Sequence, residues 1–365
     1  MSEPATGRRQ FLNEAIVATA AAWTRVAAAQ QASPDSRQTR SKMPEPELEV
    51  AILGGGPAGL SAALVLGRAR RRVDLFASGA PRNAPAHAAH SFFTRDGASP
   101  AELLQIGREQ LRPYDTVQVR DVGVASVRRT TDNHFELVDD SGRRITAGSL
   151  ILATGVVDEL PELPGLRELW GTGVFHCPYC HGWEVRDEPF LLLAESEMDA
   201  LFARALLGWS SRLTVVSRKP GFLETDTWKP LRELGVSLAT SPVVRLVPNG
   251  EGRIADVLLE NGDRLGPCAA FIKPTLRQRT TFAADLGCRF LEEGHLKGLI
   301  DVDERGFTGI PGLYAVGDAA KGVSQIVNAA AAGATAAGAL NTELLFAGKI
   351  PAPTRDAARK TSPQS

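Results

Sequence analysis

The chain has 365 residues, of which 41 are basic and 42 acidic, so its formal net charge is −1. A single hydrophobic core stops growing at roughly 250 to 300 residues, so this length favours two domains. The balanced charge excludes the global basic field that draws a protein to nucleic acid or to an anionic membrane, so we expect no nucleic acid partner. Four cysteines are too few for a secreted scaffold built on disulfides.

The first 29 residues show the order of features of an export signal. Two arginines at residues 8–9 precede a weakly apolar stretch, and three alanines at residues 27–29 fit an A-x-A cleavage site. The segment resembles a twin-arginine (Tat) signal and implies a periplasmic or otherwise exported protein; a cytoplasmic protein with an amphipathic tail is the alternative. The apolar stretch is shorter than the roughly 20 residues of a membrane span, so we expect no span. The sequence also predicts a linker at 30–46 and a flexible tail at 351–365.

A glycine-rich turn follows the first strand-like run. Residues 48–53 are apolar, GGGPAG comes next, and an alanine- and leucine-rich helical pattern follows. In this strand, turn and helix order, G-x-G-x-x-G allows a tight turn and lets a pyrophosphate approach the backbone at a helix N-terminus. The next strand, at 72–76, should end near an acid that binds ribose, but Ala77 and Ser78 stand there. We expect dinucleotide contacts at Gly54, Gly56, Pro57, Ala58 and Gly59.

Two later segments favour a flavin. Residues 149–155 form a strand pattern that ends in Ala-Thr-Gly, and residues 308–318 end in Gly-Asp before a helical pattern of small residues. Both resemble FAD contacts of flavoproteins with two dinucleotide folds, in which the aspartate binds the ribityl chain. The resemblance implies FAD contacts at Thr154, Gly155, Gly317 and Asp318.

The spacing of the three FAD segments predicts a domain that is interrupted and then resumed. The expected fold class is α/β, with two three-layer, Rossmann-like dinucleotide-binding domains, the second inserted into the first. We expect the FAD-binding domain at 47–156 and 276–350, and the inserted domain of NADPH type at 157–275.

Two of the four cysteines lie two residues apart in residues 175–184, FHCPYCHGWE. A structural zinc site needs four ligands, commonly two such pairs, and the sequence has one pair, so we expect no metal. A redox dithiol is favoured, because the sulfurs of Cys177 and Cys180 can close a small ring and a thiolate attacks disulfides or a flavin. Cys268 and Cys288 are expected to be small buried hydrophobes.

The motifs GGGPAG, ILATGVVDELP, GVFHCPYCHGWEV and GLYAVGDAA follow the order found in the low-molecular-weight thioredoxin reductases. Residues 47–347 resemble that family, and HSFFTRDG, ELLQIGREQLRPY and CPYCHGWE are most similar to its branch of dithiol oxidases. The resemblance implies a homodimer. It also implies that Cys180 faces the flavin and that Cys177 exchanges with the substrate.

A histidine follows the cysteine pair directly. Housekeeping reductases of this family typically have an aspartate there as acid and base, whereas this chain has His181. Histidine has an unperturbed pKa of about 6.5, which suits proton transfer around neutral pH. We expect His181 to be the general acid and base, with Glu184 as a candidate to orient it and His176 as a second candidate. The other histidines are expected to have surface or packing roles: His87, His90, His134 and His295.

The inserted domain lacks a second glycine-rich turn. Between the strand at 189–193 and the helical pattern at 200–209 the sequence reads AESEMD, which carries Glu195, Glu197 and Asp199 where a pyrophosphate would bind. Two like charges about 4 Å apart repel by about 1 kcal/mol in water and by about 4 kcal/mol at an effective dielectric constant of about 20. Arg218 and Lys219 are only part of a site for a 2′-phosphate. The sequence therefore argues against NADPH, unless another loop compensates.

These features predict an FAD-dependent thiol-disulfide oxidoreductase that oxidises a dithiol and uses oxygen or another acceptor in place of NADPH. Its substrate would be a small dithiol or disulfide, or a thioredoxin-like protein. One alternative is an NADPH-dependent thioredoxin-disulfide reductase. Another is a non-catalytic protein that binds a flavin or a partner, which is disfavoured because the dithiol and all three FAD segments are present.

Overall fold

A seven-stranded sheet organises the residues on both sides of the inserted segment in this computed structural model, which describes residues 46–349. Strands β3, β2, β1, β6 and β16 run parallel, whereas β4 and β5 continue the sheet antiparallel from the first half of β6. The predicted signal at 1–29, nearly all of the linker and the tail at 351–365 lie outside the described residues. The strands are β1 (Leu48–Leu53), β2 (Val73–Phe76), β3 (Val117–Arg120), β4 (Val124–Arg129), β5 (Phe135–Asp139), β6 (Arg144–Leu152) and β16 (Leu313–Ala315).

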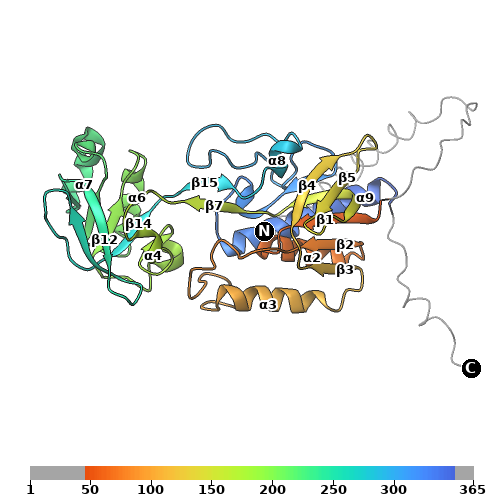
Figure 1. Ribbon diagram of the computed structural model, residues 1–365, viewed down its shortest axis with the longest axis horizontal. Helices are drawn as coiled ribbons and strands as arrows, with labels where there is room; N and C mark the ends of the chain where they lie inside the picture. Colours follow the sequence, from red (N-terminus) through yellow and green to blue (C-terminus); the bar gives the residue numbers. More distant parts are fainter. Residues whose placement is uncertain (1–45, 350–365) are drawn as a thin grey trace, which may run out of the picture. The chain divides into compact units, whose positions relative to one another are not determined.

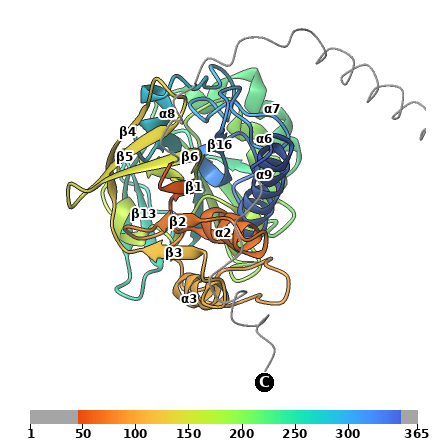
Figure 2. The same cartoon turned by 90° about the vertical axis from the view of Figure 1, so that its right-hand side faces the viewer.

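Helices cover one face of this sheet where its strands are parallel. Helix α2 (Pro57–Arg68) follows the glycine-rich turn and packs along α9 (Ile326–Phe346), with α3 (Pro100–Leu111) next to α2 (Figure 2). Apolar residues of β1, β2 and β6 fill the core beneath α2 and α9, and a second core on the other face lies against β4, β5 and the short α8 (Phe282–Asp285). The sheet is thus buried on both faces, which is typical of a parallel α/β sheet.

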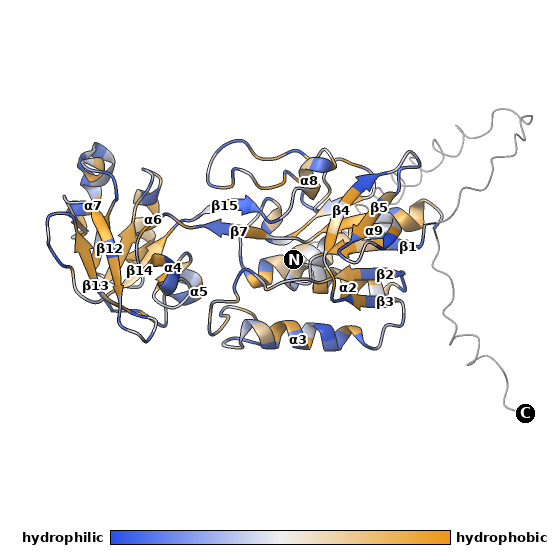
Figure 3. Ribbon diagram, viewed as in Figure 1, coloured by the Kyte–Doolittle hydropathy of each residue, from blue (hydrophilic) through white to orange (hydrophobic). Residues whose placement is uncertain are grey.

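A second sheet, fully parallel, is built by residues between β6 and β16. Its order is β11-β10-β9-β14-β8, and separate apolar cores lie on its two faces. The strands appear as hydrophobic ribbons bordered by hydrophilic loops (Figure 3). Its strands are β8 (Val174–Phe175), β9 (Phe190–Leu193), β10 (Leu213–Val216), β11 (Ser237–Leu238) and β14 (Ala269–Ile272), with the antiparallel hairpin β12 (Val243–Pro248) and β13 (Ile254–Leu259). Its short helices are α4 (Leu166–Leu169), α5 (Pro178–His181), α6 (Asp199–Leu206) and α7 (Lys229–Glu233). Two 3₁₀ turns, Phe222–Glu224 and Asp226–Trp228, precede α7 in the chain.

Two strands carry the chain into and out of this second sheet. Strand β7 (Val156–Glu159) leaves the first sheet, β15 (Thr275–Gln278) returns to it, and the two pair antiparallel (Figure 1). The insertion therefore begins and ends within one two-stranded ribbon. The fold is α/β, with two dinucleotide-binding units of Rossmann type, as the sequence predicts.

Membrane-spanning helices were searched for along residues 46–349. None of the helices in that range is both long and apolar enough to cross a bilayer.

Close packing of α2 on α9 depends on glycine. A Cβ placed on Gly333 would lie 2.0 Å from the carbonyl oxygen of Ala58, which is backbone and cannot yield. Gly59 meets a similar limit, because its Cβ would lie 1.9 Å from the carbonyl oxygen of Gly54. The glycine-rich turn is therefore held between β1, α2 and α9 at contact distances that exclude any larger residue.

Gly333→Ala should destabilise the protein by roughly 1 to 3 kcal/mol, because the added methyl group forces α2 and α9 apart. Gly338, in the same helix, is the matched control, since a Cβ there meets no atom within 4 Å. Gly338→Ala should instead stabilise the helix by up to about 1 kcal/mol. Denaturant unfolding of both variants measures the difference, and equal effects of the two substitutions would contradict this account of the packing.

Candidate flavin and dithiol site

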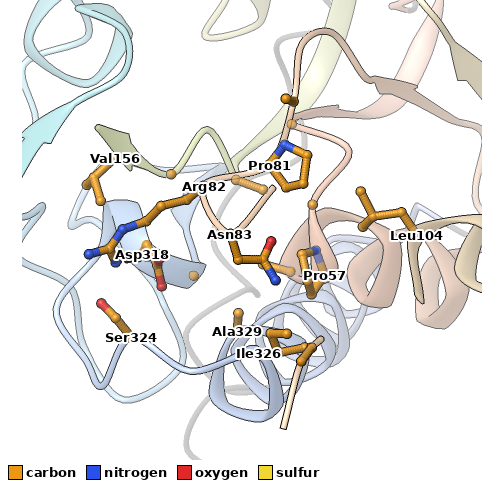
Figure 4. A pocket seen from close by; sticks show the side chains of 18 of the residues that line it. Pro57, Pro81, Arg82, Asn83, Leu104, Val156, Asp318, Ser324, Ile326 and Ala329 are labelled. Atoms are coloured by element: carbon orange, nitrogen blue, oxygen red, sulfur yellow. Dashed lines mark hydrogen bonds and ion pairs between the residues drawn. The ribbon is translucent and has the colours of Figure 1, made fainter. Parts of the chain in front are cut away.

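One cavity brings together the segments that the sequence associates with FAD and with the dithiol. It encloses about 1350 Å³ of empty space, its opening to solvent included. Its walls come from the glycine-rich turn, the loop after β2, the end of β6, the turn before α9 and the cysteine helix α5. Figure 4 shows Pro57, Arg82 and Asp318 around this space. Eight of the nine predicted cofactor residues line it: Gly54, Gly56, Pro57, Ala58, Thr154, Gly155, Gly317 and Asp318. Gly59, the ninth, is not among the described residues of its wall.

The glycine-rich turn leaves room for a pyrophosphate. Gly54 has a φ of +118°, and a Cβ on it would lie 2.1 Å from the carbonyl oxygen of Ala153, so a side chain is excluded there. Gly56, the N-cap of α2, has an ordinary φ of −76°, and its Cβ would point into open space. A glycine at this point is not needed for the fold itself. It instead allows a ligand to approach the backbone at the N-terminus of α2.

The charge of the cavity wall also suits a dinucleotide. Arg82, Arg108 and Arg279 line it, and Asp318 is the one carboxylate among its described lining residues. Ala77 and Ser78 lie on the wall at the end of β2, so the structure, like the sequence, has no acid there for the ribose. The residues fit FAD, with the pyrophosphate at the glycine-rich turn and the ribityl chain at Asp318.

Arg82 is a cavity residue that the sequence did not reveal. Its guanidinium donates to both carboxylate oxygens of Asp158 in β7, with Nη2 2.6 Å from Oδ1, and its Nη1 lies 2.9 Å from Oδ2 of Asp318. Figure 4 shows the Arg82 and Asp318 side chains pointing toward each other. Burial lowers the pKa of Arg82, but the bonds and charges of the two aspartates outweigh it, so the pKa is raised. Arg82 is therefore a permanent cation that fixes the Asp318 carboxylate.

The cysteine pair forms a disulfide at the start of helix α5. Cys177 is the N-cap of this helix, and Cys180 lies in its last turn. Cys180 lines the cavity, whereas Cys177 is not among the described residues of its wall. The prediction that Cys180 faces the flavin concerns the same cavity wall and stays a prediction. Cys268 and Cys288 are buried free thiols, and burial raises the pKa of each, to about 12 and about 11.

His181 stands beside Cys180 with both ring nitrogens available. The ring stacks on Phe175, with centroids 4.7 Å apart, and both nitrogens are buried with no hydrogen-bond partner among the described residues. Burial lowers the pKa of His181; Glu184 counteracts this in part, and His90 adds to it. The neutral imidazole is thus the form present around neutral pH, and it can accept a proton.

His176, the second candidate from the sequence, is less suited to proton transfer. Burial and the charge of Arg82 lower the pKa of His176 to about 4, although Asp158 opposes them. Its ring packs near Trp170, with centroids 5.9 Å apart. His176 therefore stays neutral at physiological pH and forms part of the cavity wall.

His90, expected from the sequence to have a surface or packing role, lies in the wall of the cavity. Its Nε2 lies 3.3 Å from Oε1 of Glu184. Glu184, expected to orient His181, contacts His90 instead and acts on His181 through its charge. The other histidines, His87, His134 and His295, are not among the residues of this wall.

In the AESEMD turn of the inserted sheet, the side-chain carboxylate of Asp199 accepts hydrogen bonds from the backbone of the same turn. Oδ2 of Asp199, a buried residue, accepts hydrogen bonds from the backbone nitrogens of Glu195 and Ser196, each at 3.0 Å, and from the Ser196 hydroxyl. In a nucleotide-binding turn, backbone N–H groups at this place point toward a phosphate. Here a side-chain carboxylate has the position and the charge of that anion.

The cations near this turn are also engaged. Arg218 donates from two nitrogens to the two carboxylate oxygens of Glu195, at 2.8 and 3.1 Å, and Lys219 donates to the Glu195 carbonyl at 2.7 Å. The hydrogen bond with Glu195 raises the pKa of Arg218. The two residues that could have met a 2′-phosphate thus bind the acidic turn itself.

Metal sites were searched for along residues 46–349. In that range no three His, Cys, Asp or Glu side chains converge in a way that could hold a metal ion.

Comparison with known proteins assigns the family. The family model described as "Pyridine nucleotide-disulphide oxidoreductase" matches residues 48–333. The chain belongs to this family. A relative named "Thioredoxin reductase sirT", from Leptosphaeria maculans, is 33% identical over 310 residues, which span 81% of this chain and 94% of the relative.

Solved structures agree with this oxidoreductase assignment. A putative thioredoxin reductase TrxB from Bacillus anthracis superimposes with a TM-score of 0.77 at 31% identity and covers 82% of this chain and 99% of its own. An oxidoreductase from Agrobacterium tumefaciens gives 0.76 at 36% identity, with coverages of 82% and 99%. The protein is an FAD-dependent disulfide oxidoreductase of thioredoxin reductase type.

Gly56→Ala tests the FAD cradle of this oxidoreductase. The methyl group would enter the open space at the glycine-rich turn, so FAD affinity should fall by roughly tenfold or more. The protein without FAD should keep its stability within about 1 kcal/mol, the usual cost of alanine at an N-cap. Flavin absorbance per protein after dialysis reports binding, and thermal unfolding reports stability. Full retention of FAD would mean that the pyrophosphate lies elsewhere.

Proposed function

We propose that the protein oxidises dithiols, with electrons entering at Cys177 and Cys180 and leaving through FAD to oxygen or to another acceptor that is not NADPH. The observation that carries this proposal is the hydrogen bonding within the AESEMD turn, in which the Asp199 carboxylate accepts from the backbone of the turn. A nicotinamide dinucleotide would have to displace the Asp199 carboxylate from two backbone N–H groups and separate Glu195 from Arg218. Breaking the hydrogen bonds of the buried Asp199 carboxylate costs about 1.5 to 3 kcal/mol each. The partly exposed Glu195–Arg218 pair adds up to about 1 kcal/mol.

The protonation state of His181 supports oxidation of a dithiol. Oxidising a dithiol releases two protons, so the site needs a base, and the lowered pKa of His181 keeps it in the basic form at neutral pH. A reductase that supplies protons to a leaving thiolate would need the protonated form. The resting state of the histidine thus favours removal of protons from the substrate.

The disulfide of Cys177 and Cys180 can oxidise a dithiol in two exchange steps. One substrate thiol gives its proton to His181, and the resulting thiolate attacks Sγ of Cys177, which breaks the Cys177–Cys180 bond and releases Cys180 as a thiolate. The second substrate thiol attacks the first substrate sulfur and gives its proton to the departing Cys177 sulfur, which forms the substrate disulfide and releases Cys177 as a thiol. Bound FAD would supply the acceptor for the two electrons of the reduced pair.

An NADPH-dependent disulfide reductase is the second candidate, because relatives of this chain carry the name thioredoxin reductase. That activity would require a nicotinamide site in the second sheet. The substrate is proposed to be a small dithiol or a thioredoxin-like protein. The homodimer implied by the family resemblance stays a prediction.

Mixing the FAD-loaded protein without oxygen with NADPH, NADH or dithiothreitol in parallel distinguishes the two candidates. Dithiothreitol should bleach the flavin, whereas both nicotinamides should leave it oxidised, and admission of air should restore the colour with uptake of oxygen. Cys177→Ser is the control, since it should bind FAD normally but should no longer be reduced by the dithiol. Rapid bleaching by NADPH would refute the oxidase.

We also propose that the protein is exported, as the paired arginines at residues 8–9 suggest. An exported oxidase is consistent with a turn that does not bind NADPH, because disulfide formation is favoured outside the cytoplasm. Residues 1–35 fused to a folded reporter should direct it across the membrane, and replacing both arginines by lysine should retain it inside. A reporter that stays inside with the original sequence would contradict export.

A further inference from the structure

His90 connects the loop after β2 with the segment that follows the dithiol. Its Nε2 lies 3.3 Å from Oε1 of Glu184, and its Nδ1 lies 3.6 Å from Oδ1 of Asp96. The imidazole is largely buried, while the carboxylates of Glu184 and Asp96 are exposed to 38% and 72%. The ring thus has a carboxylate at each nitrogen, one from its own loop and one from the inserted segment.

The loop that carries His90 is held in place by several bonds. Oδ1 of Asp96 accepts a hydrogen bond from the backbone nitrogen of Ser91 at 2.7 Å, and the hydroxyl of Ser91 donates to the carbonyl of Tyr179 at 3.4 Å. Ser91 has a φ of +62°, a strained value for a serine. These contacts fix the direction of the imidazole, so that Nε2 faces Glu184.

Glu184 in turn acts on His181. The Glu184 carboxylate raises the pKa of His181, against the effect of burial, and the charge of His90 itself lowers it by a smaller amount. His176 is the remaining titratable group that interacts with His181, and its own pKa of about 4 keeps it neutral. Three residues therefore form one unit: His90 contacts Glu184, and Glu184 sets the electrostatic environment of His181.

We propose that His90 is a positioning residue of the dithiol reaction: its imidazole holds the Glu184 carboxylate in place three residues after His181, in the segment that follows the cysteine pair. The unit moves no electrons. It governs a single step, the transfer of a proton from a substrate thiol to His181, and in this respect it rests on the proposed function. Because the loop of His90 also forms the cavity wall, the base is tuned only while the dithiol segment lies against that wall.

An NMR titration of the histidine side chains measures this directly. The chain has six histidines, and His181→Gln assigns the resonance of His181 in the FAD-loaded protein. Glu184→Gln should lower the pKa of His181. His90→Ala should lower it too, because it releases Glu184, whose effect is the larger of the two. His90→Gln keeps a nitrogen donor for Glu184 but removes the imidazole charge, so the pKa of His181 should stay at or rise above that of the original protein.

The alanine and glutamine variants separate the alternatives. If His90 acted only through its own charge, both variants would raise the pKa of His181 alike, and if it served only the loop structure, neither would change it; either result overturns the proposal. His87→Gln, at an exposed histidine three residues earlier, is the matched control and should leave the resonance of His181 unmoved. Flavin absorbance and thermal unfolding verify that each variant is folded.

The pH dependence of kcat/KM for dithiol oxidation gives the second readout. The active form of His181 is neutral, so activity is lost as pH falls through the pKa of His181. The acid limb should therefore move to lower pH in His90→Ala and Glu184→Gln, and not in His90→Gln. The titration needs no turnover, so a protein that fails to oxidise dithiols but shows these pKa changes would refute the oxidase and leave the positioning role standing.

Discussion

The ion cluster around Arg82 is the interaction on which the site depends. One guanidinium binds Asp158 in the ribbon strand β7 and Asp318 in the turn before α9. A buried charge is tolerated only when it is paired and hydrogen-bonded, so loss of any member would leave an unpaired charge at the cavity wall. The cluster therefore joins the loop after β2, the entry to the inserted sheet and the predicted ribityl contact. The same cation helps to keep His176 neutral beside Cys177.

The turns after β1 and β9 differ in how their backbone N–H groups find a hydrogen-bond acceptor. Backbone N–H groups at the beginning of a helix need an acceptor. At the first turn, Gly56 leaves open space, so an external anion can satisfy them. At the second turn, Asp199 satisfies them from within the chain. The first turn therefore leaves its backbone donors open to a ligand, whereas two backbone donors of the second turn have an acceptor within the chain.

Much of the fold could be predicted because its signals are local. The strand at residues 48–53, the glycine-rich turn and the dithiol are each contained in a short stretch, and the strand agrees with β1 residue by residue. Strand β6 was less predictable, since it begins at Arg144, five residues before the predicted segment, where polar residues pair with β5. The apolar pattern marks only the half of a strand that is buried on both faces.

The cavity residues missed by the sequence share another property. Arg82 and His90 lie in a loop that has no helical or strand period, and their partners are 76 and 94 positions away, at Asp158 and Glu184. Only the tertiary fold brings such pairs together. The one available signal was the missing acid after β2, where Ala77 and Ser78 stand, because it indicates that the cofactor environment differs from the usual pattern.

The dithiol depends on the inserted sheet for its position. Strand β8 leads into Cys177, and it pairs with β14, which in turn pairs with β9. The apolar cores on both faces of that sheet fix where α5 begins and hence where Cys180 faces the cavity. The inserted sheet is therefore the scaffold of the cysteine pair, and removal of this domain would remove the dithiol itself.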